Sequence, residues 1–258
     1  MRIENKALVL RRVPFRDTSW IVTLLTPGFG VVSAVARAAR LGGRDGARGA
    51  LTGFHLLEVE LRARTEEALG TLSRVEILEA RNRLPFMATA TAAGQVLIEA
   101  VHRFEMPGDA RGGEVFACLD SSLEALEAEV EPLVVVAGAL GRLLGLFGHG
   151  WRVRDCVGCG RRERLRFFSV RRGGAVCEPC GLPYAHRLPE ASASLLRALS
   201  DRSWPPAMIG LSREEMALLY RLGMAGLARI GTQELSADGT FRRLAGLDGF
   251  QEIKGYAS

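Results

Sequence analysis

The sequence predicts an α+β protein, with an N-terminal barrel of five strands and a helical domain into which a small four-cysteine module is inserted. Three observations favour this fold class. Residues 6–79 form short runs with strand alternation, residues 86–147 place apolar residues at helical spacing, and residues 156–181 contain two Cys-x-x-Cys pairs. With 258 residues, 48% of them hydrophobic and 24% charged, the chain can form one large core or a few small ones.

The barrel is predicted from five runs rich in Val, Ile, Leu and Thr, at residues 6–13, 19–26, 30–37, 54–63 and 69–79. Leu57, Val59 and Leu61 alternate with charged residues, as expected of a half-buried strand. Turn residues separate the runs, including "TPGFG" at 26–30 and "RLGGRDGARG" at 40–49. Five short antiparallel strands suit a small closed barrel of the OB type. Strand periodicity alone leaves a sandwich fragment or an SH3-like barrel open.

The pattern becomes helical after Pro85, and helices are predicted at residues 86–106, 114–130 and 132–147. Pro107 ends the first of these helices, whereas Pro132 fits the first turn of the third.

A second helical group is predicted beyond the cysteines, at about residues 189–201 and 212–228. Ser212 is expected to cap the last helix, with Glu215 completing a capping box. The segment after Gly231 is rich in glycine and polar residues, so it is predicted to be loosely held.

The most specific motif is C-x2-C-x17-C-x2-C, which is formed by Cys156, Cys159, Cys177 and Cys180. This spacing is typical of a four-thiolate zinc site, and four protein ligands close the coordination sphere, so one structural Zn²⁺ is predicted. Gly160 and Gly181 follow the pairs, where glycine permits a tight turn with backbone N–H groups directed at sulfur. Iron uses the same ligands, and the spacing does not exclude it. Disulfides and a redox pair are disfavoured in a cytoplasmic chain that lacks a βαβ setting.

Basic residues are concentrated in particular segments of the chain, whose formal net charge is +5. Residues 151–175 hold eight arginines against two carboxylates, while residues 81–150 hold nine carboxylates against five arginines. Clustered cations favour contact with a polyanion, because phosphate binding releases counterions. The arginines between the cysteine pairs either face phosphates or solubilise an exposed loop, and Phe167 and Phe168 are expected in the core of the module. A GC-rich genome would also favour arginine over lysine.

Motifs of common enzymes are missing from the sequence. It has no Walker A loop, HExxH, GxSxG, or GxGxxG after a strand, so a binding protein is predicted rather than an enzyme. The N-terminus lacks the apolar region of a secretory signal, and the apolar run 133–147 is interrupted by Arg142 and too short to span a bilayer. A cytoplasmic location without membrane contact is therefore expected.

The order of these features resembles the RecO family of bacterial DNA repair and recombination mediators. The resemblance lies in "KALVLRRVPFRDTSWIVTLLTPGFGVVSAVARAAR", a basic glycine-containing loop, "LTGFHLLEVELRAR" and "LGTLSRVEILE", and continues to the cysteine pairs. It covers most of residues 3–230. The chain departs from the usual family pattern at Ala38, where glycine is common, and at Gly53, where proline is frequent.

The resemblance implies an OB-fold DNA-binding domain, a two-part helical domain, a zinc module and a C-terminal tail, at residues 1–80, 81–150 with 186–230, 151–185 and 231–258. It also implies a protein that binds single- and double-stranded DNA (ssDNA and dsDNA) and anneals complementary strands. Members of the family bind the C-terminal tail of single-strand binding protein (SSB) and act with RecR to load the RecA recombinase. A zinc-stabilised adaptor between proteins, with incidental DNA contact, is the alternative hypothesis.

The resemblance also indicates which residues contact DNA. The expected contacts are Arg37, Arg40, Arg44 and Arg48, with Arg11 and Arg12 as candidates on the first strand. Arginine suits this role because its planar fork binds phosphate without reading sequence. The helical domain is expected to offer the SSB tail an apolar groove with a basic rim.

Overall fold

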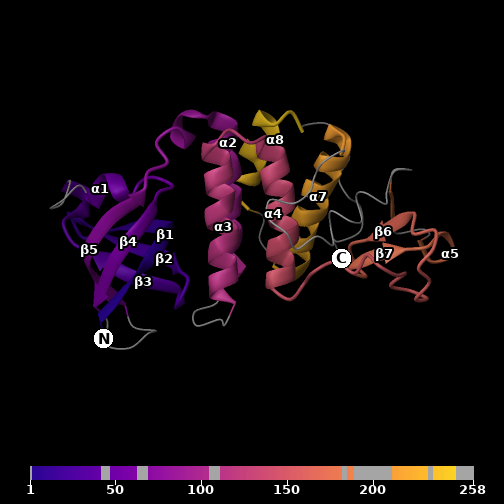
Figure 1. Ribbon diagram of the computed structural model, residues 1–258, viewed down its shortest axis with the longest axis horizontal. Helices are drawn as coiled ribbons and strands as arrows, with labels where there is room; N and C mark the ends of the chain where they lie inside the picture. The colour runs from indigo at the N-terminus through magenta and orange to yellow at the C-terminus, as the bar shows by residue number, and fades with distance from the viewer. Residues whose placement is uncertain are drawn as a thin grey trace. The chain divides into compact units, whose positions relative to one another are not determined.

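The computed structural model describes residues 2–41, 47–62, 69–104, 111–181, 185–188, 211–231 and 235–247. The chain forms two compact units, Met1–Glu129 and Val130–Ser258 (Figure 1). The first unit contains the strands β1–β5 with the helices α1, α2 and α3, and the second contains the helices α4, α7 and α8 and the cysteine segment. Among the described residues, every helix is too short or too polar to cross a lipid bilayer.

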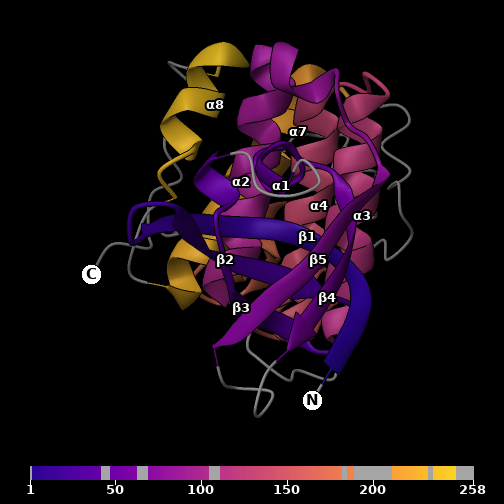
Figure 2. The ribbon, with the colours of Figure 1, turned by 90° about the vertical axis from the view of Figure 1, so that its left-hand side faces the viewer.

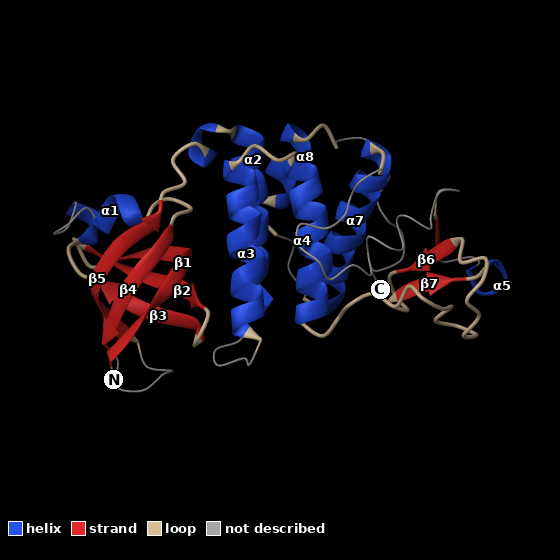
Figure 3. Cartoon of the chain, in the orientation of Figure 1, coloured by secondary structure: helices blue, strands red, loops and turns tan. Residues whose placement is uncertain are grey.

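Five strands close into a barrel in the first unit, which confirms the fold predicted for this part of the chain (Figure 3). The strands are β1 (Arg2–Phe15), β2 (Ser19–Thr26), β3 (Gly30–Ala36), β4 (Leu56–Arg62) and β5 (Gly70–Glu79). Their order around the barrel is β1-β2-β3-β5-β4, with β4 also paired to β1.

The prediction of purely antiparallel strands is wrong at one seam. β3 and β5 run parallel, with Ala34 opposite Gly70 and Val35 opposite Thr71. The reason is topological. Neighbouring antiparallel strands alternate in direction, and an odd number of strands cannot alternate all the way around a closed ring. A five-stranded barrel therefore needs a parallel pair, and here β5 forms it when it closes the ring against β3.

Apolar side chains that point inward fill the barrel. Strand β3 alternates buried and half-buried residues along its whole length, as expected of a strand with one face in the core. The core is completed by the short helix α1 (Ala47–Ala50) and by Leu51, which is fully buried. Helix α1 lies at the end of the barrel away from the N-terminus (Figures 1 and 2).

Two helices pack on the barrel, α2 (Ala88–Phe104) against β1 and α3 (Gly112–Glu127) against β2 and β3. A short 3-10 helix, η3 (Leu84–Phe86), joins β5 to α2. The Glu127 carboxylate accepts the backbone N–H groups of Arg83 and Leu84 at 3.0 and 2.7 Å, so the end of α3 fixes the start of this connection.

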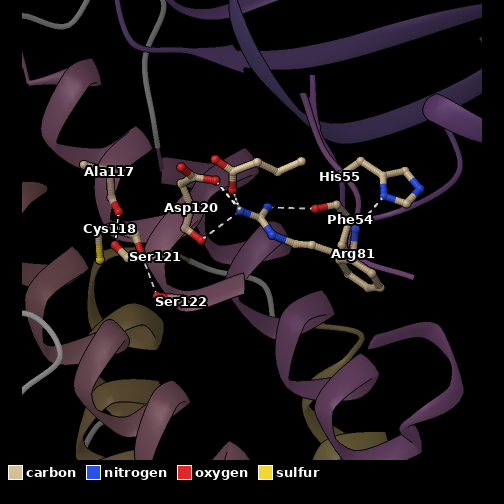
Figure 4. Close-up of polar contacts among 9 residues, drawn as sticks. Phe54, His55, Arg81, Ala117, Cys118, Asp120, Ser121 and Ser122 are labelled. Atoms are coloured by element: carbon tan, nitrogen blue, oxygen red, sulfur yellow. Dashed lines mark hydrogen bonds and ion pairs between the residues drawn. The ribbon is translucent and has the colours of Figure 1, made fainter. Parts of the chain in front are cut away.

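Arg81 links the barrel to α3 through buried polar contacts (Figure 4). Its side chain is 3% exposed, and Nη2 lies 2.5 Å from Asp120 Oδ1. Nη1 donates to the Phe54 carbonyl at 2.8 Å, and the backbone N–H donates to His55 Nδ1 at 2.9 Å. Burial, together with the nearby Arg81 charge, lowers the pKa of His55, which keeps the imidazole neutral and able to accept this bond.

The second unit is built on α4 (Pro132–Leu146) and α7 (Arg213–Ile230), which pack side by side. Glycines let the helices approach closely, since a Cβ at Gly223 would lie 2.8 Å from Leu140 Cβ. The Ser212 capping box at the start of α7 and the position of Pro132 in the first turn of α4 are confirmed. The helix predicted at about residues 189–201 lies outside the described residues.

The expectation of a loosely held segment after Gly231 is wrong for residues 235–247. They contain α8 (Asp238–Leu244), whose Phe241 is fully buried and lies 5.2 Å from the Tyr220 ring, centroid to centroid. The Tyr220 hydroxyl donates to the Asp238 carboxylate. Phe241 anchors this segment, and its signal is hidden among the surrounding glycines and polar residues.

The cysteine segment forms a small module attached to these helices. It contains β6 (Phe167–Ser169), β7 (Gly174–Val176), α5 (Glu178–Gly181) and β8 (His186–Arg187), with sheet order β7-β6-β8. Trp151 forms the attachment, because its ring meets Phe168 edge-on at 5.0 Å and a Cβ at Gly226 of α7 would lie 2.7 Å from it. The Arg229 guanidinium lies over the Trp151 ring, 5.2 Å from its centroid.

Candidate functional site

The structure brings the four predicted metal ligands together. The sulfur atoms of Cys156, Cys159, Cys177 and Cys180 all lie within 4.8 Å of one another. Tetrahedral zinc with Zn–S bonds of about 2.3 Å requires sulfur atoms about 3.8 Å apart, and the Cys159 and Cys177 sulfurs are separated by 3.6 Å. This set of four thiol groups therefore fits a closed metal site with no position left for a substrate.

The backbone N–H groups around the cysteines also support a metal site. The N–H groups of Gly158 and Cys177 each lie 3.4 Å from Cys156 Sγ. Burial acts to raise the pKa of Cys156, but hydrogen bonds from backbone N–H groups, that of Cys177 first, lower it to about 6. Gly160 adopts a φ of 75°, which confirms the tight turn expected there, whereas Gly181 is needed for close packing against Phe167.

The two phenylalanines between the cysteine pairs belong to the core of the module, as predicted. Phe168 is 1% exposed, and Phe167 packs with Leu165, Val176 and the cysteines. The arginines of the same segment are exposed.

Basic residues of the first unit gather at one end of the barrel. The β1–β2 turn and the segment that follows β3 meet there, since Arg40 donates its backbone N–H to Thr18 O at 2.9 Å and its Nη1 to Arg16 O at 3.1 Å. Arg12 reaches the same end, where Nη1 donates to Leu51 O at 3.0 Å and the guanidinium lies 5.5 Å from the Trp20 ring. We name this region the barrel-end surface, and its exposed arginines are Arg12, Arg16, Arg37, Arg40 and Arg48.

One predicted DNA contact, Arg11, lies away from this surface. Arg11 lies on the face of β1 opposite to Arg12, as strand alternation requires. Burial lowers the pKa of His102 in α2, and the nearby positive charge of Arg11 lowers it further. Arg44 lies outside the described residues. Arg16 was not among the predicted contacts. Its position could have been inferred, because strands connected by hairpins alternate in direction, so the β1–β2 turn and the end of β3 lie at the same end of the barrel.

Ala38, where the family pattern has glycine, adopts a strained backbone conformation. Ala38 has a φ of 56°, the left-handed conformation that glycine adopts freely, and its N–H faces the Ser19 hydroxyl at 3.4 Å. The departure at Gly53 has a steric reason, since a Cβ there would lie 2.4 Å from His55 Nε2.

Replacing Ala38 with glycine is expected to stabilise the protein by about 0.5–1 kcal/mol, because the left-handed conformation costs an L-residue more than glycine loses in chain entropy. Urea denaturation measures the change. The control is Ala36→Gly in the extended strand β3, which should destabilise. If Ala38→Gly also destabilises, the positive φ at this position is not strained.

Comparison with known proteins agrees with this architecture. The family model described as Recombination protein O N terminal matches residues 1–81, and Recombination protein O C terminal matches residues 87–222. A relative from Myxococcus xanthus is 36% identical over 80% of this chain and 84% of its own length, and one from Streptomyces griseus is 31% identical over 79% and 84%. A relative from Bacillus pumilus is 28% identical over 76% of each chain. All three are named DNA repair protein RecO, and this chain belongs to the RecO family.

Proposed function

We propose that this protein binds ssDNA and dsDNA, anneals complementary strands and acts with RecR to load RecA onto SSB-coated DNA in the cytoplasm. No chemical turnover is required for these steps. The observation that carries the DNA-binding proposal is the barrel-end surface. Within the described part of the chain, its arginines form no ion pair, so their charge is available to phosphate. Membership of the RecO family supports the annealing and loading steps.

Trp20 has a structural role in this surface rather than that of a base-stacking platform. It packs against the barrel core while its ring supports the Arg12 guanidinium. Phosphate contacts should therefore dominate the affinity, with little dependence on base sequence.

We also propose that the metal held by the four cysteines is one structural Zn²⁺. A full set of sulfur donors with no open position supports a structural ion, and elemental analysis of the purified protein separates zinc from iron. The bound metal would crosslink the segments around Cys156 and Cys177 and so stabilise the module.

The DNA contact is tested by reversing charge at the barrel-end surface. The variant Arg37→Glu, Arg40→Glu, Arg48→Glu is expected to weaken oligonucleotide binding strongly in fluorescence anisotropy at about 0.15 M salt. For the unmodified protein, the logarithm of affinity should fall with the logarithm of salt concentration by about 0.7 for each phosphate contact on a single strand. Unchanged affinity in the variant would contradict this assignment, and a flat salt dependence would contradict phosphate binding altogether.

A charge-matched control replaces Arg74, Arg83 and Arg243 with glutamate. These residues lie outside the barrel-end surface and the cysteine module, so the control variant should bind DNA normally. The annealing of complementary oligonucleotides, measured first with the protein alone and then with RecR and SSB, tests the second part of the proposal. Annealing that appears only with those partners would favour the adaptor hypothesis.

A further inference from the structure

The cysteine module carries a dense group of exposed, unpaired cations. We name them the module arginines: Arg161, Arg162, Arg164, Arg166, Arg171 and Arg172. Among the described residues, none of them forms an ion pair. Arginines elsewhere do pair, as in Arg103 with Glu99 at 2.6 Å and Arg81 with Asp120 at 2.5 Å. A stable protein has no folding reason to leave so many like charges uncompensated in one ribbon, because they repel one another.

The module holds two of these arginines, Arg161 and Arg172, at its first cysteine turn. The Arg161 carbonyl accepts the Cys156 N–H at 2.7 Å, which places this arginine directly beside the turn. Arg172 arrives from the β6–β7 connection, and its Nη1 lies 3.1 Å from the position that a Gly158 Cβ would take. Two segments distant in sequence therefore bring cations to the same small region, and the turn itself is fixed by hydrogen bonds to Cys156 Sγ.

We propose that the module arginines form a second nucleic-acid contact, which binds the phosphate backbone separately from the barrel-end surface. This inference rests on the proposed DNA-binding function and extends it to the other compact unit. A chain with two such contacts can hold two strands at once, or two parts of one strand.

The chemistry favours a nucleic-acid backbone over an acidic protein. Arginine forks bind phosphate oxygens bidentately, and a polyphosphate strand supplies charge at every nucleotide, which matches cations spread over the first cysteine turn and the β6–β7 connection. Among the described residues of the module, the aromatic rings pack in its core or in its attachment through Trp151, so none of them accompanies these charges as a stacking ring. The contact should consequently be strongly salt-dependent and indifferent to sequence.

The test neutralises three module arginines that the structure does not use for packing, in the variant Arg161→Gln, Arg162→Gln, Arg171→Gln of the full chain. If each contacts one phosphate, the salt slope of oligonucleotide binding falls by about 2, and affinity at about 0.15 M salt falls by roughly tenfold to a hundredfold. The control variant Arg74→Gln, Arg83→Gln, Arg243→Gln changes net charge equally and should retain the original slope. Equal metal content and thermal stability show that the module is folded.

Combining the module and barrel-end variants separates the two proposals. The barrel-end variant should retain weak, salt-dependent binding, which disappears in the combined variant. If the module variant binds like the unmodified protein and the combined variant binds like the barrel-end variant, the second contact is wrong while the proposed function stands. If, in addition, the module variant no longer binds an acidic protein partner, the module arginines form a contact with protein rather than with DNA. If the unmodified protein binds no DNA, the proposed function itself fails.

Discussion

Replacing Arg81 with methionine is expected to destabilise the first unit by about 3–5 kcal/mol, the range for breaking a buried ion pair from one side. Methionine matches the length of the arginine stem but leaves the Phe54 carbonyl and the Asp120 carboxylate without their donor. The cost is large because both acceptors are held against a side chain that is only 3% exposed. Urea denaturation followed by circular dichroism measures the loss, and hydrogen exchange assigns it to the peptides of β4, β5 and α3.

The structure offers a matched control on the adjoining strand. Arg74 lies on β5 and pairs with Glu76 in solvent, so Arg74→Met should leave the unfolding midpoint unchanged. The double variant Arg81→Met, Asp120→Leu removes both charges and should recover part of the loss, because no uncompensated carboxylate remains. An Arg81→Met protein as stable as Arg74→Met would show that this contact does not hold α3 on the barrel.

The sequence could predict the elements of the fold because their signals are local. Alternation identified the barrel strands, and a single capping box placed the start of α7 correctly. The first strand was predicted to begin at Lys6, whereas β1 begins at Arg2. The missed residues 2–5 are defined by pairing with β4 rather than by apolar alternation. The Arg81 contacts were not predictable, because they join residues 54, 81 and 120, which only the folded chain brings together.

The candidate site shows the same limit. The cysteine ligands were predictable because metal ligands follow fixed short spacings, and the structure gathers all four. The DNA contacts were grouped by sequence proximity, which placed Arg11 and Arg12 together. Strand alternation sends them to opposite faces, and only Arg12 reaches the barrel-end surface. Applied to each residue, the same periodicity that identified the strand would have separated them.

Replacing Cys177 with serine is expected to remove the metal and unfold the cysteine module. Serine is a poor zinc ligand, and binding free energies of structural zinc, about 10–16 kcal/mol in small domains, are the main source of their stability. Cys177 also lies at the centre of the small module core, 1% exposed, and directs its N–H at Cys156 Sγ. Metal content should fall from one equivalent per chain to none, and hydrogen exchange should rise across residues 151–181.

Two further measurements show whether the metal acts through this module alone. Cys118→Ala removes the fifth cysteine, which is buried in α3 of the first unit, and should leave metal content unchanged. In the Cys177→Ser protein, the packing of α4 on α7 should persist, because it depends on contacts such as Gly223 with Leu140. Trp151 should become exposed, and its fluorescence should shift to the red, because its ring packs on Phe168 of the module. A Cys177→Ser protein that keeps one metal ion and its full Tm would rule out a structural metal at these four cysteines.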